Sequence, residues 1–183
     1  MHTPSIVAGA LAWSAFAAPA LATEPAGARA RPPEATAPTA NPLIDYPGFV
    51  GLATQVGPYR AKRLLPIAEF KRRAGSTGAL LLDARSAGAF RRGHIDGAIN
   101  LPLPDFTAES LSHVVGPDRA RPIYIYCNNN FRNNVSPVVT KSVQLALNIQ
   151  TFINLVGYGY TQVWELGEAV DMNDPAIGWV SSS

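Results

Sequence analysis

The residue with the clearest capacity for chemistry in this sequence is Cys127, the only cysteine in the 183-residue chain. It directly follows an uncharged run, 123–126, whose β-branched and aromatic residues are typical of a short strand buried on both faces of a parallel sheet. In α/β proteins ligands bind in the crevice outside the carboxyl ends of such strands. The sequence therefore predicts a thiol at a position where α/β folds place their reactive groups.

A short polar loop follows the cysteine and consists of Asn128, Asn129, Asn130, Phe131 and Arg132. A neighbouring cation or a helix N-terminus lowers the pKa of a thiol, and successive backbone N–H groups can form a site for an anion. We therefore expect Cys127 to be a nucleophile and the loop to bind an anionic substrate. Substrate binding by the three asparagine side chains and a plain polar turn both remain open. For the thiol itself, the alternative is an inert, buried cysteine.

Several other polar residues are more easily explained by structure than by catalysis. His94 follows a glycine and precedes an apolar residue, which favours a structural hydrogen bond over a general base. Asp83 and Arg85 flank the end of a second apolar run, and we expect them to hold loops together. The three histidines are far apart in sequence, and the cysteine has no potential ligand close by. The sequence thus predicts neither a metal site nor a cofactor.

The amino-terminal region has the composition of a targeting segment followed by a spacer. Residues 1–22 contain no Lys, Arg, Asp or Glu, and their apolar stretch is shorter than the ~20 residues that a membrane span needs. The sequence Ala20-Leu21-Ala22 predicts cleavage of a signal peptide after Ala22, and hence a periplasmic or secreted protein. Since the segment lacks a basic side chain, an uncleaved anchor remains the alternative. Residues 23–42 are rich in Ala and Pro and predict a disordered linker, which leaves 43–183 as one folded domain.

The charge and the distribution of aromatic residues give no sign of a nucleic-acid partner. The formal net charge is +2 and only 15% of the residues are charged, with no basic run and no aromatic residues interleaved with Lys and Arg. We therefore expect no nucleic-acid partner. We also expect no membrane span after signal cleavage.

Alternating strand and helix patterns predict an α/β fold with a central parallel sheet and helices on both faces. Strands are expected at 59–65, 79–83, 98–101, 123–126 and 161–166. Helices are expected at 67–74 and 87–92, and from a cap at Asp105 to Val115. A last, long helix is expected from Val139 to Leu155, with a break near Asn148.

Four sequence motifs, found in the family's order, resemble those of the rhodanese-like domain, in its single-domain exported type. They are Leu81-Leu82-Asp83-Ala84-Arg85, Gly93-His94-Ile95-Asp96-Gly97-Ala98-Ile99-Asn100, Cys127 with Arg132, and the segment from Gly159 to Gly167. The resemblance implies a sulfurtransferase whose cysteine carries a persulfide sulfur. It also implies a small anionic sulfur donor such as thiosulfate and a thiol or cyanide-type acceptor. Because a lone thiol in an oxidising compartment has to be kept reduced, a reductase is a further candidate partner, which the sequence leaves open. Phosphatase chemistry, which places its arginine one residue later, is disfavoured because position 133 is Asn133.

Two features of the sequence depart from the family pattern. Asn130 occupies a loop position at which family members often carry glycine. The separation between Cys127 and Gly159 is also longer than usual, which places an insertion at 133–145 that we expect to border the active loop. These departures motivate the alternative function, a rhodanese-fold binding or redox-sensing module with weak or no catalysis.

Overall fold

The computed structural model describes residues 41–181. The predicted signal peptide, 1–22, and nearly all of the predicted linker, 23–40, lie outside this range. Within 41–181 no helix is both long enough and apolar enough to cross a bilayer.

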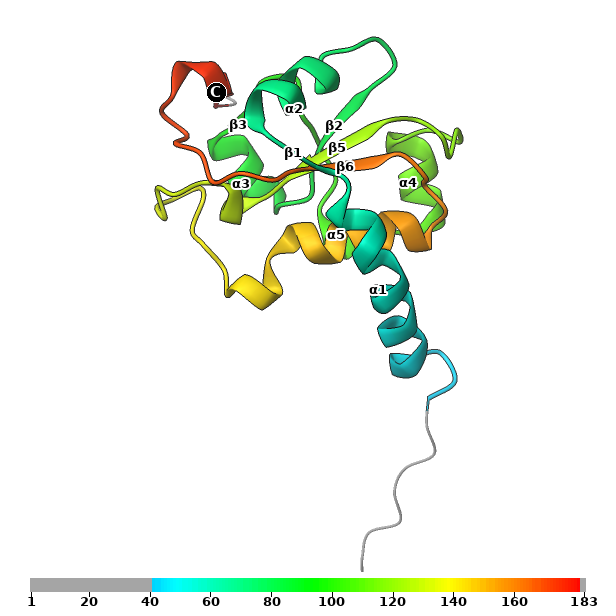
Figure 1. Cartoon of the computed structure of the whole chain (residues 1–183). Helices are drawn as coiled ribbons and strands as arrows, with labels where there is room; N and C mark the ends of the chain where they lie inside the picture. Colours follow the sequence, from blue (N-terminus) through cyan, green and yellow to red (C-terminus); the bar gives the residue numbers. More distant parts are fainter. Residues whose placement is uncertain (1–40, 182–183) are drawn as a thin grey trace, which may run out of the picture. The chain divides into compact units, whose positions relative to one another are not determined.

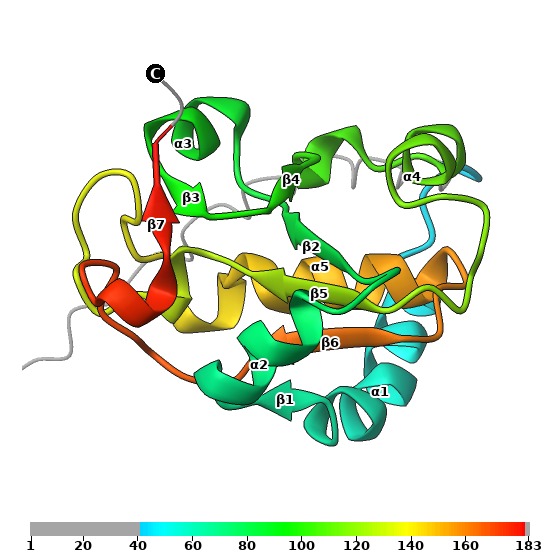
Figure 2. The same cartoon turned by 90° about the horizontal axis from the view of Figure 1, so that it is seen from above.

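A sheet of five strands forms the centre of the domain, and all of its pairings are parallel. Its strand order is β1-β6-β5-β2-β4, so that β5 is the central strand and lies between β6 and β2 (Figure 2). A separate two-stranded antiparallel ribbon joins β3 and β7. The strands are β1 (Leu64–Leu65), β2 (Leu80–Asp83), β3 (His94–Ile95), β4 (Ile99–Asn100), β5 (Ile123–Tyr126), β6 (Val163–Leu166) and β7 (Trp179–Val180).

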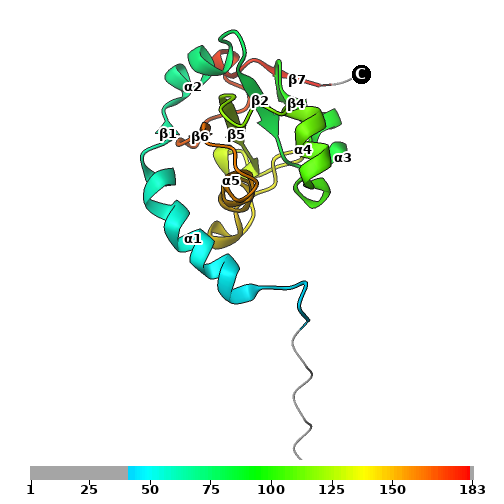
Figure 3. The same cartoon turned by 90° about the vertical axis from the view of Figure 1, so that its right-hand side faces the viewer.

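Helices cover both faces of the sheet, with α1 and α5 on one side and α2 on the other (Figures 1 and 3). The α-helices are α1 (Tyr46–Ala61), α2 (Ile67–Ala74), α3 (Ala87–Arg92), α4 (Ala108–Val114) and α5 (Leu147–Gly157). Short 3-10 turns occur at Leu103–Asp105, Asn128–Asn130, Val143–Leu145 and Pro175–Ile177. The predicted α/β fold with a parallel sheet and helices on both faces is confirmed.

The alternating side chains of β5 explain why this strand is apolar throughout. Ile123 and Ile125 are fully buried in the core under α1, α4 and α5, whereas Tyr124 and Tyr126 are buried in the opposite core under α2. Because side chains alternate along a strand, the next residue, Cys127, belongs to the face covered by α5.

Three of the expected elements differ in the structure. The prediction of a strand at 59–65 is wrong, because helix α1 continues to Ala61 and only Leu64–Leu65 pairs with β6. The helical conformation lets the ring of Tyr59 pack against Phe152 on α5, with centroids 5.8 Å apart.

The other two differences concern helix starts. Helix α4 begins after Thr107, whose hydroxyl oxygen accepts from the Ser110 N–H in a capping box, and not at Asp105, which ends a 3-10 turn. Helix α5 begins only at Leu147, because the backbone at Ala146 is extended, so most of the stretch expected to be helical from Val139 is not.

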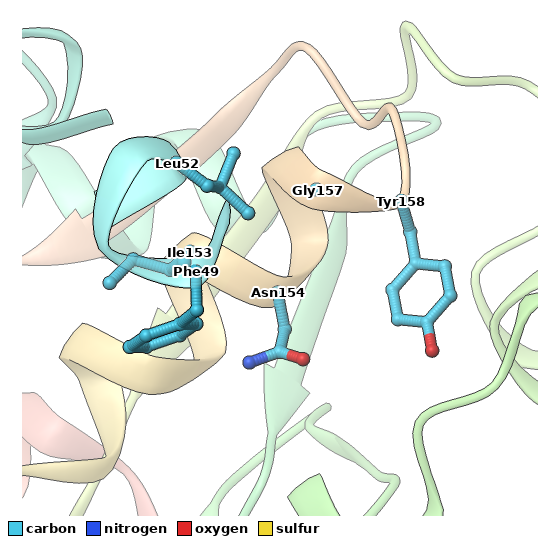
Figure 4. Close-up of a pocket in the computed structure, with 6 residues that line it drawn as sticks. All are labelled: Phe49, Leu52, Ile153, Asn154, Gly157 and Tyr158. Atoms are coloured by element: carbon cyan, nitrogen blue, oxygen red, sulfur yellow. The ribbon is translucent and has the colours of Figure 1, made fainter. Parts of the chain in front are cut away.

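Helix α1 lies against α5 and forms with it a shallow groove of mixed polar and apolar lining (Figure 4). Phe49 and Leu52 of α1 face Ile153 and Gly157 of α5 around a cavity of about 250 Å³. The helices approach so closely that a Cβ on Gly157 would lie 3.0 Å from Leu52 Cδ2. The groove is lined by no cysteine and no charged side chain, so its lining supplies no nucleophile and no acid or base for catalysis.

Candidate active site

Cys127 lies at the carboxyl end of the central strand β5, as predicted, and only 2% of its surface is exposed. Its side chain lines a cavity of about 330 Å³. The polar part of the cavity wall comes from several elements that are distant in sequence: Arg60, Asn129, Asn130, Asn148, Glu165 and Glu168. The thiol is therefore enclosed by the fold but borders a space large enough for a small ligand.

The electrostatic surroundings of the thiol act in opposite directions. Burial raises the pKa of Cys127 above its ordinary value, and the charge of Glu165 acts in the same direction. Hydrogen bonds from the backbone N–H groups of Asn148, Asn129 and Leu147 lower the pKa, but less than burial raises it. In this conformation the sulfur is therefore a protonated thiol at neutral pH, held among donors that are suited to a negative charge.

Two of these donors belong to the amino terminus of α5. Leu147 and Asn148 form the first turn of that helix, whose N–H groups have no partner within the helix and carry partial positive charge. Their position at the sulfur follows from the face of β5 on which Cys127 lies. A charge that develops on this sulfur, or on a second sulfur attached to it, is stabilised by the same groups.

Asn130 holds the loop in shape. Its Oδ1 accepts from the Cys127 N–H at 2.9 Å, and its Nδ2 donates to the carbonyl oxygens of Leu166 and Glu168 at 2.7 and 3.1 Å. The loop closes as a 3-10 turn over Asn128–Asn130, so the backbone at Asn130 needs no glycine-like conformation. The side chain of Asn130 thus ties the loop to the strand beside it.

The side chains of the other two loop asparagines bind the inserted segment. Asn128 Nδ2 donates to the Val139 carbonyl at 2.8 Å. Asn129 both donates to the Lys141 carbonyl at 2.9 Å and accepts from the Lys141 N–H at 3.1 Å. The expectation that residues 133–145 border the active loop is confirmed.

The last two loop residues point away from the cavity at Cys127. Phe131 is 2% exposed and packs edge-to-face against Tyr126 and Trp179. Arg132 is exposed, and its Nη2 donates to the Ala169 carbonyl at 3.0 Å. Neither side chain lines this cavity.

A second cavity, of about 260 Å³, lies on the other side of the contact between the loop and α5. It is lined by Asn128 and Leu147, which are direct sequence neighbours of residues in the first cavity, and by Lys141 of the insertion. Arg85 and Ser86 form its opposite wall. The inserted segment therefore contributes to both spaces around the active loop.

The structural interpretations of Asp83, Arg85 and His94 are confirmed. Asp83 and Arg85 form a buried ion pair at 2.6 Å, and Arg85 also donates to the Gly93 carbonyl at 2.7 Å. The Tyr126 hydroxyl donates to Asp83 at 2.7 Å. His94 Nδ1 donates to the Phe90 carbonyl at 2.9 Å, and its ring stacks on the ring of Phe90. These groups join β2, β5 and the segment before β3.

Sequence reasoning missed Arg60, Asn148 and Glu165, which surround the same cavity as Cys127. Arg60 falls in the stretch expected to be a strand, and the other two residues lie within apolar stretches. Glu165 interrupts the run Val163–Leu166, and Asn148 stands between Leu147 and Ile149. A polar residue inside an otherwise buried pattern needs a partner, and this was the signal that could have identified both. Among residues 41–181 no group of His, Cys, Asp and Glu is arranged to hold a metal ion.

The chain is similar to one curated protein and to several solved structures. The chain is 31% identical over 91 residues to the uncharacterized protein YqhL of Bacillus subtilis (strain 168), a match that covers 50% of this chain and 69% of that protein. Among solved structures, thiosulfate sulfurtransferase from Pseudomonas aeruginosa matches 65% of this chain and 20% of its own, at 24% identity and a TM-score of 0.42. The polysulfide-sulfur transferase homodimer of Wolinella succinogenes matches 73% of this chain and 90% of its own, at 16% identity and a TM-score of 0.43.

The family model named Rhodanese-like domain matches residues 67–167, which include β2, the segment around His94, the cysteine loop and β6. The matched segment contains four of the five strands of the parallel sheet and the loop that begins at Cys127. Since the match extends over more than half of the sequence, the chain belongs to the rhodanese-like domain family.

Proposed function

We propose that this protein is a sulfurtransferase in which Cys127 carries a sulfane sulfur as a persulfide. The observation that carries the proposal is the convergence of backbone N–H groups from Asn129, Leu147 and Asn148 on a lone thiol at the end of the central strand. The family supports the proposal because the matched segment contains the whole of this arrangement.

The proposed reaction has two displacement steps. In the first, the Cys127 thiol loses its proton to solvent, and the thiolate attacks the outer sulfur of a donor such as thiosulfate. A bond forms between Sγ and that sulfur, while the sulfur–sulfur bond of the donor breaks and sulfite leaves with the electron pair. In the second step a thiolate or cyanide attacks the outer sulfur of the persulfide, and the electron pair of the broken bond returns to Sγ.

The environment of Cys127 suits the persulfide stage better than the resting thiol. A buried thiol with a raised pKa is protected while no donor is present. The same N–H groups then stabilise the charge of the persulfide in an enclosed space, where such hydrogen bonds are strong. We further propose that Arg132 binds the anionic donor, which requires its hydrogen bond to the Ala169 carbonyl to be exchanged.

The second candidate function is a binding or redox-sensing module, and the burial of the thiol favours it. Cys127 is 2% exposed and its pKa is raised, whereas an efficient nucleophile needs access and thiolate character. Rapid reaction of Cys127 with a thiol probe at neutral pH would exclude a binding module whose thiol is inert. An unreactive thiol in the folded protein supports it.

The experiment that tests the sulfurtransferase proposal is intact-mass spectrometry after incubation with thiosulfate. The wild-type protein is expected to gain one sulfur atom and to lose it again on addition of cyanide. Cys127→Ser, which replaces only the sulfur, is the matched control and is expected to gain nothing. No adduct on a folded wild-type protein would contradict the proposal.

A further inference from the structure

Arg60 lies in the last turn of α1, before the segment that matches the family model, yet its side chain borders the cavity at Cys127. Its Nε and Nη2 bind the two carboxylate oxygens of Glu165, each at 2.6 Å. This is the fork-to-fork geometry that makes arginine–carboxylate pairs strong. The side chain of Glu165 is 5% exposed and that of Arg60 28%, so the carboxylate is the buried partner.

Glu165 lies on the same face of the sheet as the thiol. It is paired with Ile125 across β5 and β6, and Cys127 comes two residues after Ile125 on the same face. A buried carboxylate at this place is costly unless it is paired, and its negative charge disfavours a thiolate nearby. The guanidinium of Arg60 compensates this negative charge through the paired hydrogen bonds.

The carboxylate of Glu165 in turn holds the start of α5. Glu165 Oε1 accepts from Asn148 Nδ2 at 3.1 Å, and the same Nδ2 donates to Asn130 Oδ1 at 2.9 Å. Asn130 Oδ1 also accepts from the Cys127 N–H. A continuous chain of bonds therefore runs from α1 through β6 and α5 to the backbone of the cysteine. Asn130, Asn148 and Glu165 are all buried.

We propose that Arg60 is a positioning residue for sulfur transfer, whose ion pair with Glu165 holds Asn148 and thereby the first turn of α5 against the sulfur of Cys127. The inference rests on the proposed function, since it assigns a role in that reaction. It makes α1 part of the active unit, although the family model begins after this helix.

The charged groups around the thiol define how the proposal is tested. From β6 and the segment after it, Glu165 and Glu168 face the cavity, and from α1 only Arg60 does. Glu168 Oε2 accepts the Ile67 N–H at 2.8 Å at the start of α2. Helix α5 contributes no charged side chain to the cavity, only its first-turn N–H groups.

The test compares Arg60→Met, Arg60→Lys and the double variant Arg60→Met/Glu165→Gln with wild type. Two quantities are measured against pH: the rate of Cys127 alkylation by iodoacetamide, and the single-turnover rate of persulfide formation from thiosulfate. Arg60→Met is expected to slow both by about tenfold at neutral pH and to move the alkylation profile to higher pH by about one unit, because the thiolate fraction falls tenfold per unit. Arg60→Lys, which keeps the charge but loses the fork, is expected to fall in between.

The double variant supplies the rescue. The amide that Glu165→Gln introduces is neutral but can still accept from Asn148, so both rates are expected to return to within a few-fold of wild type. Arg63→Met is the matched control, because Arg63 lies three residues further on, binds Gln162 at 3.2 Å and does not line the cavity. If Arg60→Met does not fold, Arg60→Lys and Glu165→Gln alone carry the test, and Glu165→Gln is expected to move the alkylation profile to lower pH.

The outcomes separate the positioning role from the function itself. The positioning role would be overturned by unchanged alkylation and persulfide rates in folded Arg60→Met. It would also be overturned if the double variant restored stability but neither rate. Both outcomes would leave the sulfurtransferase proposal intact. A wild-type protein that takes up no sulfur would refute the function. In that case the alkylation profiles still decide whether Arg60 controls the thiol.

Discussion

Asn129 and Lys141 exchange a pair of hydrogen bonds, from the Asn129 side-chain amide to the Lys141 carbonyl at 2.9 Å and from the Lys141 N–H back to Asn129 Oδ1 at 3.1 Å. The loop that carries the thiol is thereby tied to a segment inserted into the chain. The loop and the insertion both line the two cavities around the loop, so we expect this contact to limit access to Cys127.

Replacing Asn129 by Ala is expected to expose the thiol. The substitution removes both side-chain bonds but keeps the backbone N–H that points at the sulfur. At about 1 kcal/mol for each of the two bonds, the rate of Cys127 alkylation at neutral pH should rise by roughly thirtyfold. Asn154→Ala on α5, which removes a side-chain bond to the Gln150 carbonyl, is the control and should leave the rate unchanged. An unchanged rate in Asn129→Ala would mean that the insertion does not limit access.

The reactivity of Cys127 should depend on pH in a way that reflects its burial. Its pKa in the folded state lies above the ordinary value because of burial, so the midpoint of the alkylation profile should lie at a higher pH than that of the unfolded chain. Since the folded-state pKa exceeds the unfolded one, the protonated thiol stabilises the fold below the unfolded pKa of about 8.5, and this contribution is lost as the pH rises through the folded value. Urea denaturation at pH 7 and pH 10 checks this, with Cys127→Ser expected to lose less stability over the interval than wild type.

The buried pair of Asp83 and Arg85 should be essential for folding. The two side chains are 0% and 1% exposed, so Arg85→Met leaves the Asp83 carboxylate buried without its cation, at a cost of about 3–5 kcal/mol. Glu69→Gln is the contrasting control, because Glu69 pairs with Arg72 and Arg73 at the surface, and its denaturation midpoint should stay close to wild type. Equal midpoints for the two variants would show that the buried pair contributes little.

Gly93 should tolerate no side chain, because the indole of Trp179 lies directly over it. A Cβ at this position would lie 2.3 Å from Trp179 Nε1. Gly93→Ala is therefore expected to lower the free energy of unfolding by about 1–3 kcal/mol. Gly88→Ala is the matched control within α3, where the nearest atom is Arg92 Nη1 at 3.6 Å, and it should be neutral or stabilising. Thermal unfolding of the two variants distinguishes them, and a stable Gly93→Ala would contradict the packing argument.

Export and processing are predictions that rest on the sequence of residues 1–22. Expressed in full length in a bacterial host, the protein should be recovered from the periplasm with an intact mass that begins at Thr23. Ala20→Lys, which removes the small residue before Leu21-Ala22, should block cleavage. A wild-type protein recovered with residues 1–22 still attached would favour the uncleaved anchor.

Local patterns in the sequence were sufficient to predict strands β2 and β5 and the position of the thiol. The apolar runs at β2 and β5 predict buried strands because a strand covered on both faces has no polar side, and Cys127 follows directly. Helices α2 and α3 were also predicted at their observed positions. In these segments the short-range pattern and the final packing favour the same conformation.

The tertiary structure alone decided which residues surround the thiol. Arg60 and Glu165 are far apart in the chain and meet because β1, which follows α1, pairs with β6 and places Leu64 beside Glu165. The packing of α1 on α5, with Tyr59 against Phe152, accompanies the helical conformation that replaces most of the strand expected at 59–65. The asparagines of the loop bind the insertion, and Arg132 points to Ala169, because each backbone carbonyl near them needed a donor. Pairings of this kind depend on the distance between elements after folding, and no short-range pattern in the sequence carries that distance.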